Sequence, residues 1–449
     1  MRPLQGDAFP FCPHEQMKGT AVPTSRPSST LAAALLVALA FALGFAEFVL
    51  IGITPDVAEA LGVPLTLVGD LVGYYALACA VATPLVSLAG ARFARFNLMA
   101  ALLVVFNLGN LITLFSAGYG LLAVSRMMAA ATSGTLLAIA LAYIPEIMPP
   151  GKVARVIALV LAAFSVSSVV GVPIGTMLST AFGWKAAYAA VLVCGLAATS
   201  VVFALPRGGR AEARAGIRAQ LHLLGDARVL VNIAMILAGA ASTYVFYTYL
   251  TPILEGIMGY PSAAVSAILL LFGAACVASN LLSGWMANRF GMRGLPFSFA
   301  LHAALLALLA ATIPLGMVGL ANIMAVGVVM YVMNSTVQML FQDVARTDYP
   351  SAVTFSASLH PMSFNAGIAL GSFAGGAVVN TGGLLATGPA GAALGLAAAG
   401  LAVVLARLVA ARRRAEAKRA GSGAAVGRAA VGGARAAGER HSRKSEQKA

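Results

Sequence analysis

Long apolar segments separated by short polar gaps occupy most of this 449-residue chain. A helix needs roughly 20 apolar residues to cross about 30 Å of hydrocarbon, and the segments have this length. Only helices and closed barrels satisfy backbone groups in lipid. Because the segments are rich in Leu, Ala and Gly and do not alternate with polar residues, the pattern predicts membrane-spanning helices. The twelve predicted spans are 31–53, 71–90, 98–117, 120–143, 156–178, 186–205, 229–250, 263–284, 296–314, 317–340, 354–378 and 389–410.

The positive charges follow the gaps between these spans. Of the 29 Lys and Arg residues, 26 lie before the first span, after the last one, or in the even-numbered gaps. Cytoplasmic loops of membrane proteins retain Lys and Arg, whereas translocated loops exclude them. The pattern therefore predicts a multi-pass membrane protein with both termini in the cytoplasm. Three residues lie elsewhere: Lys185 lies in an odd-numbered gap, Arg126 lies inside a span, and Arg407 lies at the cytoplasmic end of the last span.

Composition supports the same class of protein. Apolar residues make up 60% of the chain, charged residues 10%, and the mean hydropathy is +0.90. A soluble domain carries about 25% charged residues, so that class is excluded. The net charge of +14 lies largely in 207–228 and 407–448, which the charge rule already assigns to the cytoplasm, so it does not indicate nucleic-acid binding.

The two halves of the chain resemble each other. The central gap is the longest and divides the spans six plus six, so a second copy would re-enter the membrane in the same orientation. Parallel repeats of this kind place a substrate site near the midplane between them. Matching residues recur at an offset of 196 or 197: Thr54-Pro55 with Thr251-Pro252, Arg92 with Arg289, and Gly171 and Gly175 with Gly367 and Gly371.

The predicted organisation has five regions. The bundles lie on either side of a cytoplasmic loop, and the basic tail is not expected to fold alone. Met1 and Met17 are both open as the start of translation. The regions are a cytoplasmic segment 1–30, a six-helix bundle 31–205, the central loop 206–228, a second six-helix bundle 229–410, and the tail 411–449.

Several motifs, taken in order, resemble those of the major facilitator superfamily. Within it they resemble the twelve-span drug:proton antiporters, and especially the sugar or arabinose efflux branch. The resemblance covers residues 31–410 and implies an all-α integral membrane protein of two parallel six-helix repeats around a central cavity. The matching motifs are Gly44 to Pro55, with its Glu-Phe pair; Gly284 to Arg293, with Asn288 in place of the usual aspartate; Ser125-Arg126 with Gly134; Gly171-Val-Pro-Ile-Gly175; and Ser363 to Gly371.

Glu47 and Arg126 are the charged residues well inside spans. A charge at bilayer depth costs about 2.5–3.5 kcal/mol on insertion scales, so such groups usually face a cavity or a partner. Each lies roughly 9 Å below the outer boundary at 1.5 Å per residue, and the resemblance implies that both helices line the cavity. We expect Glu47 to bind and release a proton while Arg126 favours its charged form. A static ion pair that fixes helix packing is the alternative.

The glycines of the fifth span and the basic loops have two interpretations each. Gly171, Pro173 and Gly175 of the fifth span form what we call the antiporter motif. Small residues allow close helix approach and a mid-span proline kinks a helix, so the resemblance implies that this motif seals the cavity against leakage. Ordinary helix packing is the alternative. The loop residues either cap helix ends and latch one conformation or simply follow the charge rule. The two sets are Gly171, Pro173 and Gly175, and Arg92, Arg95, Gly284, Asn288, Arg289, Gly291 and Arg293.

Other polar residues lie in spans that have cavity-facing sides in this fold. Their amide and phenol groups are candidates for substrate contact, although many such residues only bond between helices. His360 is an alternative proton carrier, His302 is expected to bond between helices, and Asp70 to be solvated at a helix start. The substrate candidates are Tyr244, Tyr247, Asn334, Gln338 and Asn365.

The sequence thus predicts a secondary transporter rather than an enzyme. It has no phosphate-binding loop, catalytic constellation or metal-type spacing, so we expect no cofactor and no metal. The expected activity is proton-coupled efflux of a small molecule such as a drug, sugar or metabolite, by a monomer in the bacterial cytoplasmic (inner) membrane. Uptake by proton symport is the alternative. The expected partners are the substrate, protons and the lipid bilayer, with no nucleic acid.

Overall fold

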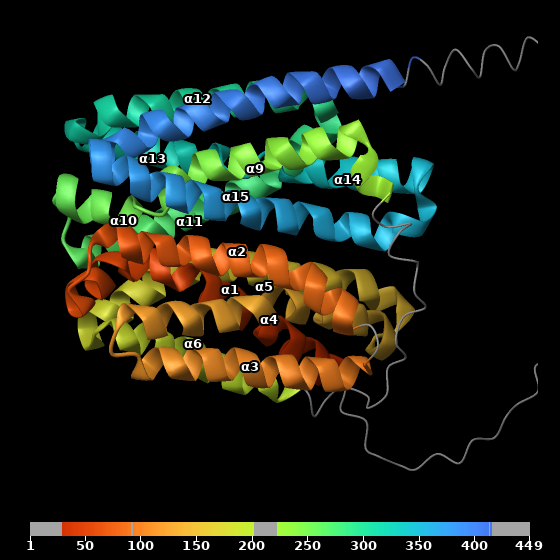
Figure 1. The fold of residues 1–449 in the computed structure, drawn as a ribbon, viewed down its shortest axis with the longest axis horizontal. Coiled ribbons are helices and arrows are strands. Elements are labelled where there is room, and N and C mark those ends of the chain that lie inside the picture. The colour runs from red at the N-terminus through yellow and green to blue at the C-terminus, as the bar shows by residue number, and fades with distance from the viewer. Residues whose placement is uncertain (1–28, 91–92, 202–221, 413, 415–449) are drawn as a thin grey trace, which may run out of the picture.

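A computed structural model of the protein describes residues 29–90, 93–201, 222–412 and 414. All regular elements within these ranges are helices, which confirms the predicted all-α fold. The helices run side by side along the long axis in Figure 1, with the N-terminal helices (red to yellow) below the C-terminal ones (green to blue). Among the described residues, 11 helical segments are long and apolar enough to cross a membrane, and a shorter apolar helix lies at Trp184–Thr199.

The helices coincide with the predicted spans. We call the side on which the first helix begins and the last one ends the terminal side, and the opposite side the distal side. The first half comprises α1 (Ser29–Leu61), α2 (Leu65–Gly90), α3 (Arg95–Phe115), α4 (Tyr119–Ile147), α5 (Pro150–Phe182) and α6 (Trp184–Thr199). The second half comprises η1 (Leu223–Gly225), α9 (Ala227–Tyr247), α10 (Leu250–Pro252), η2 (Ile253–Ile257), α11 (Ser262–Arg289), η3 (Gly291–Arg293), α12 (Gly294–Thr312), η4 (Ile313–Leu315), α13 (Met317–Val329), α14 (Asn334–Asp348), η5 (Pro350–Ala352), α15 (Val353–Gly382), η6 (Leu384–Ala386) and a last helix, 387–412.

Two spans of the second half are interrupted, which the hydropathy pattern did not predict. α9 ends at Tyr247 and the short α10 begins at Leu250, close to Pro252. α13 ends at Val329 and α14 begins at Asn334. A helix break leaves backbone N–H and C=O groups without their helical partners. Because lipid cannot form hydrogen bonds with these groups, each group needs a partner inside the protein.

Serines of α11 supply partners for the break between α13 and α14. Ser279 and Ser283 are one turn apart and almost completely buried. Their hydroxyl oxygens accept hydrogen bonds from the backbone N–H groups of Tyr331 and Ser335, each at 2.8 Å. The broken span is therefore stabilised by its neighbour rather than by its own sequence.

Glycines bring α1 and α5 into close contact. A Cβ on Gly171 would lie 2.7 Å from the Phe45 side chain, and one on Gly175 would lie 2.6 Å from the Val49 side chain. Both distances are shorter than carbon atoms tolerate, so neither position has room for a larger residue.

The repeated glycines make the corresponding contact in the second half. A Cβ on Gly367 would lie 2.6 Å from Ala240 Cβ, and one on Gly371 would lie 2.6 Å from the Ala241 carbonyl oxygen. Both neighbours belong to α9. α15 therefore packs against α9 as α5 packs against α1, and the sequence offset of 196 joins positions that are equivalent in space.

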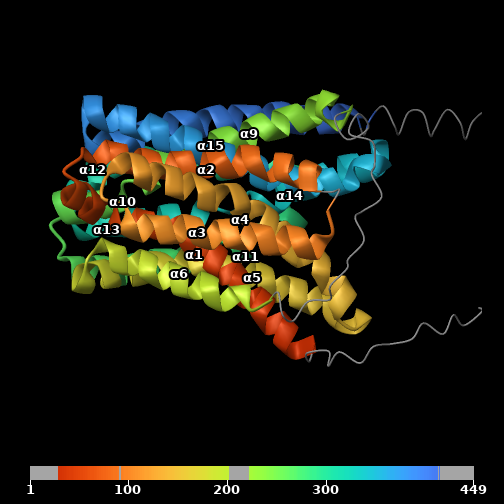
Figure 2. The same ribbon diagram turned by 60° about the horizontal axis from the view of Figure 1, so that its bottom comes forward.

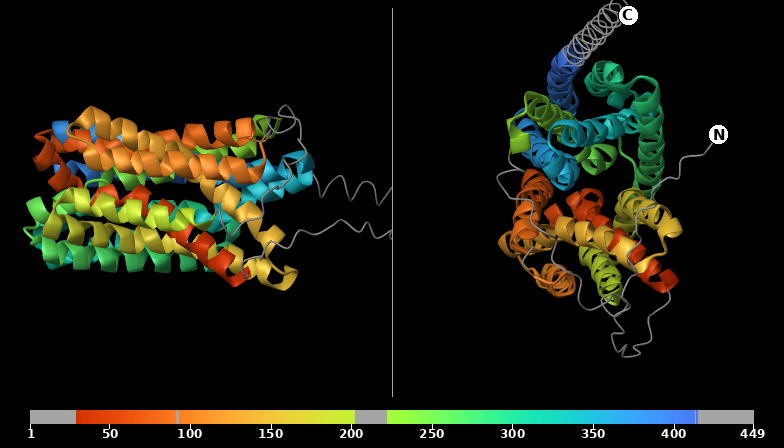
Figure 3. Two further views of the ribbon diagram at one scale, coloured as in Figure 1. Left: turned by 90° about the horizontal axis from the view of Figure 1, so that it is seen from below. Right: turned by 90° about the vertical axis from the view of Figure 1, so that its right-hand side faces the viewer.

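The halves pack together mainly through α2 against α15 and α5 against α11, and α10 also contacts α1. Figures 1 and 2 both show α2 alongside α15. The rings of Tyr74 in α2 and Phe373 in α15 lie 5.2 Å apart. The right-hand view of Figure 3, seen from the terminal side, shows the two groups of helices facing each other. A site between them can therefore contact both halves.

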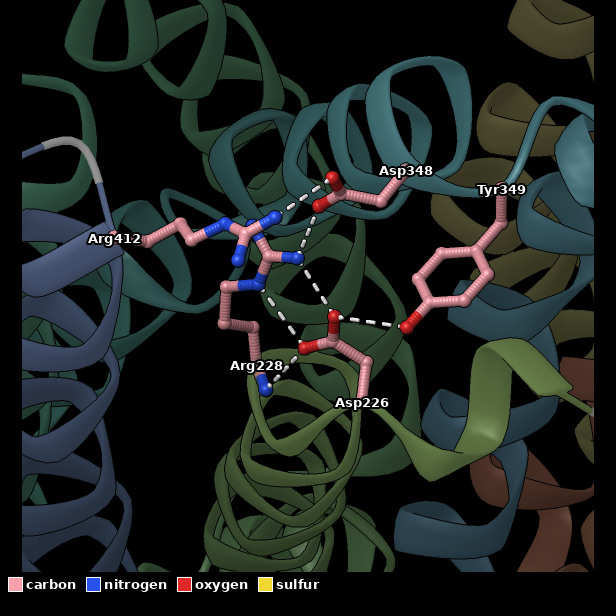
Figure 4. Close-up of polar contacts among 5 residues, drawn as sticks. All are labelled: Asp226, Arg228, Asp348, Tyr349 and Arg412. Carbon is pink, nitrogen blue, oxygen red and sulfur yellow. Dashed lines mark hydrogen bonds and ion pairs between the residues drawn. The ribbon is translucent and has the colours of Figure 1, made fainter. Parts of the chain in front are cut away.

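A cluster of charged residues ties helix ends together on the terminal side of the second half (Figure 4). Arg228, at the start of α9, donates hydrogen bonds to Asp226 at 3.0 and 2.6 Å and also binds Asp348 at the end of α14. Arg412 of the last helix binds Asp348 at 3.1 Å. The Tyr349 hydroxyl donates to Asp226 at 3.4 Å. We call Asp226, Arg228, Asp348 and Arg412 the terminal clamp; it joins three helices of one half.

Asp226 contributes to the clamp as an ionised group. Burial raises the pKa of Asp226, but the hydrogen bonds and charge of Arg228 outweigh burial and hold that pKa below its usual range. Asp226 also caps α9, since its carboxylate accepts the backbone N–H of Arg228 at 2.8 Å. At an offset of 197, the first half carries Ser29, Leu31 and Gly151 in place of Asp226, Arg228 and Asp348. The clamp residues are therefore specific to the second half.

The role of Ser279 and Ser283 of α11 can be tested by removing one of these two hydrogen-bond acceptors. Ser279→Ala leaves the Tyr331 N–H buried without its partner, so we expect a loss of about 0.6–2 kcal/mol, the range for hydrogen bonds between membrane helices. The measurement is the thermal unfolding midpoint in detergent. Ser266→Ala is the matched control, because Ser266 is also buried and its hydroxyl donates within its own helix, to the Ser262 carbonyl. Equal losses in the two variants would contradict this role for Ser279.

The terminal clamp can be tested without removing the helix cap. Asparagine caps helices as well as aspartate does, so Asp226→Asn isolates the charge. Hydrogen bonds to charged groups contribute about 1.5–3 kcal/mol, and we expect a loss of that order at neutral pH. Because the pKa is lower in the folded state, the contribution is complete above about pH 4 and is lost as the pH falls through the folded-state pKa.

The measurement is the difference in unfolding midpoint between wild type and Asp226→Asn as a function of pH. Asp343→Asn, at an exposed position of α14, is the control and should leave the midpoint unchanged. A difference that already disappears near neutrality, or a control that behaves like Asp226→Asn, would contradict the assignment.

Candidate functional site

Arg126 of α4 is 1% exposed and is surrounded by helices of the first half. It donates hydrogen bonds to the carbonyl of Ala46 in α1 and, at 3.4 Å, to the amide oxygen of Asn110 in α3. Its guanidinium lies 4.6 Å from the ring centroid of Tyr75 in α2 and 5.0 Å from that of Tyr188 in α6. Cation–π contacts contribute about 2 kcal/mol or more when desolvated. The guanidinium is thus stabilised by neutral groups from four helices.

Glu47 follows Ala46 in α1 and is half-buried. The contact between Arg126 and Ala46 places the two charges at the same depth, and Arg126 acts on Glu47 electrostatically. Within the described part of the chain no ion pair joins them. The carboxylate also lies within electrostatic range of Tyr244 and Tyr331 in the second half. Glu47 therefore lies near the interface between the halves, whereas Arg126 is enclosed by the first half.

The second half contributes an aromatic cluster to this interface. The ring of Phe364 in α15 lies 6.2, 6.0 and 5.9 Å from those of Tyr244, Tyr331 and His360. Tyr247 adds a ring 5.5 Å from that of Tyr244. Tyr331 lies in the break between α13 and α14, so one ring of the cluster comes from the interrupted part of this span. We call these five side chains the aromatic cluster.

Polar atoms near this cluster have unused hydrogen-bonding capacity. Oδ1 of Asn334, Oδ1 of Asn365 and Nε2 of His360 are buried and have no partner among the described residues. The Nδ2 atom of Asn365 donates within its own helix at 3.1 Å, and that of Asn334 lies 3.5 Å from Oδ1 of Asn280. Gln338 lies one turn beyond Asn334 and is half-buried. These side chains leave free acceptors beside an apolar surface.

The prediction for His302 is confirmed, and that for Asp70 is not. His302 bonds between helices as predicted, with Nε2 3.0 Å from the Thr243 hydroxyl. Asp70 was expected to be solvated at a helix start, and this is wrong: it lies inside α2 and is half-buried. A Cβ on Gly376 of α15 would be 3.1 Å from its carboxylate. The reason is that α15 covers this part of α2, which the sequence of α2 alone does not reveal.

The antiporter motif lies at two contacts. Gly171 and Gly175 face α1, as described above. Pro173 has no N–H, so the Val169 carbonyl, four residues earlier, lacks its usual helical donor. Gly273 of α11 lies against this carbonyl: a Cβ at that position would be 2.8 Å from its oxygen. The motif thus helps α5 approach both its own half and the other one.

The basic loop motif, residues 284–293 with Arg92 and Arg95, does not bring helices into close contact in this way within the described ranges. Gly291 has a φ of 52°, a conformation that favours glycine, and it allows the tight turn between α11 and α12. Asn288, Arg289 and Arg293 are exposed, and neither arginine forms an ion pair with a residue that the structure describes. Arg92 lies outside the described residues, Arg95 begins α3, and Gly284 has open space around it. The charges seen to pair here are those of the terminal clamp.

Comparison with known proteins agrees with this architecture. A family model described as Major Facilitator Superfamily matches residues 36–360. The uncharacterized MFS-type transporter YtbD of Bacillus subtilis is 31% identical over 343 residues, 76% of this chain and 86% of the relative. A chloramphenicol resistance protein of Streptomyces lividans is 31% identical over 248 residues, 54% of this chain and 63% of the relative.

A solved structure of a D-xylose-proton symporter has a TM-score of 0.67 at 13% identity and covers 84% of this chain and 97% of its own. That likeness shows the fold alone. The helices, the two packed halves and the matching family model lead to one conclusion: the chain belongs to the major facilitator superfamily, as a multi-pass membrane transporter of small solutes with relatives in the efflux-type branch.

Proposed function

We propose that the protein exports a small molecule in exchange for protons by alternating access. The observation that carries this proposal is the position of Glu47: a half-buried carboxylate near the interface, close to a buried arginine and to the aromatic cluster. A carboxylate in a membrane span is costly and usually serves a proton or substrate pathway. Asp70 of α2 is a second half-buried carboxylate near this interface, but Glu47 is the one that lies beside Arg126.

In this proposal Glu47 is the group that carries the proton. When the site opens to the distal side, Glu47 takes up a proton and the substrate leaves. When it opens to the terminal side, the positive charge of Arg126 favours the ionised carboxylate, so the proton is released. The hydrogen bond from Arg126 to Ala46 keeps the guanidinium close without neutralising Glu47 by a direct ion pair.

The aromatic cluster and the free polar atoms near it are the proposed substrate-binding surface. Rings supply a large apolar contact area, and Oδ1 of Asn334 and Asn365 can accept hydrogen bonds from a ligand. An aromatic compound with hydroxyl or amide groups suits such a surface. The relative named as a chloramphenicol resistance protein supports this class and the direction of export. Gly171 and Gly175 support export as well, because close packing of α5 limits leakage.

The proposed orientation puts the terminal side in the cytoplasm of a bacterial cell. Lys152, Arg155, Arg289 and Arg293 all lie at helix ends on that side, whereas Lys185 lies on the distal side. This distribution follows the charge rule. Both termini are then cytoplasmic, and the working unit is proposed to be a monomer in the inner membrane.

Proton coupling is tested with Glu47→Gln and Arg126→Ala in cells that accumulate labelled chloramphenicol. Wild-type cells should accumulate less drug than cells without the protein, and collapse of the proton gradient should raise accumulation. Both variants should accumulate as much as cells without the protein, because the titratable carboxyl or its neighbouring cation is missing. Glu59→Gln, at an exposed position at the distal end of α1, should export normally.

Undiminished export by both Glu47→Gln and Arg126→Ala would overturn the assignment of the proton site. Accumulation that falls when the gradient collapses would indicate uptake by symport in place of export.

The substrate surface is tested with Phe364→Ala, which removes the ring shared by three contacts of the aromatic cluster. Aromatic pairs contribute about 0.5–1.5 kcal/mol beyond their buried area, so the concentration for half-maximal export of chloramphenicol should rise about two- to tenfold. Phe297→Ala is the matched control, because Phe297 of α12 is 69% exposed. Equal effects of the two variants would contradict a substrate surface at Phe364.

A further inference from the structure

The distal ends of the two halves are joined at a carbonyl that a proline has left free. In an α-helix the N–H of residue 55 would bond to the carbonyl of residue 51, but Pro55 has no N–H. α1 nevertheless continues through Pro55 to Leu61. The Ile51 carbonyl therefore lacks its main helical donor, in a segment where Ile51 itself is fully buried.

Thr251 of the second half supplies the missing donor. Its hydroxyl donates a hydrogen bond to the Ile51 carbonyl at 2.9 Å, across 200 residues of sequence, and the bond is buried. The Thr54 hydroxyl donates to the Leu50 carbonyl at 2.8 Å and makes a longer contact of 3.4 Å with the Ile51 carbonyl, so Thr251 provides the shorter bond to Ile51. The two Thr-Pro pairs are sequence repeats, yet in this structure one frees an acceptor and the other provides the donor that fills it.

The broken helix beside Thr251 places a second group between the halves. Tyr249 lies in the gap between α9 and α10 and is fully buried. A Cβ on Gly69 of α2 would collide with its hydroxyl and lie 2.8 Å from its Cζ atom. A Cβ on Gly375 of α15 would lie 2.9 Å from Cε2. The ring thus occupies a slot that exists because both neighbouring helices carry glycine there.

We propose that Thr251 and Tyr249 form a latch that holds the distal side shut, with the Ile51 carbonyl as its acceptor and Gly69 as its slot. The latch joins the break between α9 and α10 to the first half, so opening the distal side requires the hydrogen bond to break and the ring to leave the slot. This inference rests on the proposed alternating-access function and adds the positioning residues that set the resting state.

The latch is tested by hydrogen–deuterium exchange of the whole protein in detergent, read by mass spectrometry on distal peptides of α1, α2 and α10. Thr251→Val keeps the shape of the side chain and removes the donor. Exchange in these peptides should rise about three- to thirtyfold, which corresponds to the ~0.6–2 kcal/mol of a hydrogen bond between membrane helices. Thr251→Ser should restore the wild-type rate, whereas Thr180→Val, which removes a hydroxyl that bonds within its own helix, should not change it.

A second variant tests the slot without touching the hydrogen bond. The three atoms nearest to a Cβ at Gly69 all belong to Tyr249, a residue of the other half, so Gly69→Ala should disfavour the closed distal side and raise the same exchange rates. Tyr249→Phe removes the atom nearest to the new methyl group and should partly reverse the effect. Gly120→Ala is the control, because a Cβ there meets nothing within 4 Å.

Pro55→Ala tests the origin of the acceptor. It gives the Ile51 carbonyl a donor from its own helix, so it should raise distal exchange, and combining it with Thr251→Val should add little, since both act on one bond. Full additivity would overturn the role of Pro55. Unchanged distal exchange in Thr251→Val and Gly69→Ala would overturn the latch. Raised exchange without drug export by wild type would instead support the latch and contradict proton-driven export.

Discussion

A guanidinium that cannot reach water determines how the first half is arranged. Arg126 is enclosed at bilayer depth, where a charge costs about 2.5–3.5 kcal/mol on insertion scales. The protein offsets this cost with the Ala46 carbonyl, the Asn110 amide and the rings of Tyr75 and Tyr188. Four helices must therefore keep their positions around one side chain. As a consequence, α1 is fixed at Ala46, and the next residue, Glu47, lies near the interface with the second half.

The second half meets this carboxylate with interrupted helices. Two of its spans are broken. Tyr331, in one break, belongs to the aromatic cluster, and Tyr249, in the other break, packs against Gly69 of the first half. Backbone groups freed by the breaks are satisfied by neighbours such as Ser279. The terminal clamp holds the other ends of the same helices. The two sequence repeats thus differ in structure: in the described residues the first half keeps unbroken helices around a charge, whereas the second combines breaks with ion pairs.

Much of the fold could be predicted from hydropathy and charge, because a span needs a certain length and cytoplasmic loops need Lys and Arg. Glu47 and Arg126 were also identifiable, since charges inside apolar spans are rare. The breaks could not be predicted, because Tyr331 depends on a serine of another helix. The clamp was missed for a similar reason: Asp226 and Asp348 are ordinary residues at span ends until the fold brings them together. Asp70 was misplaced because α15 of the other half lies against its carboxylate, which the sequence of α2 alone does not reveal.

The central claim is that Glu47 exchanges protons under the influence of Arg126. The most direct measurement is labelling of Glu47 by dicyclohexylcarbodiimide, which reacts with protonated carboxyl groups, in membranes that contain the whole protein, followed by peptide mass spectrometry. The account predicts that labelling falls as the pH rises and that Arg126→Ala moves this fall to higher pH, because the neutral carboxyl is then favoured. No labelling of Glu47 at any pH, or an identical pH profile in Arg126→Ala, would contradict it.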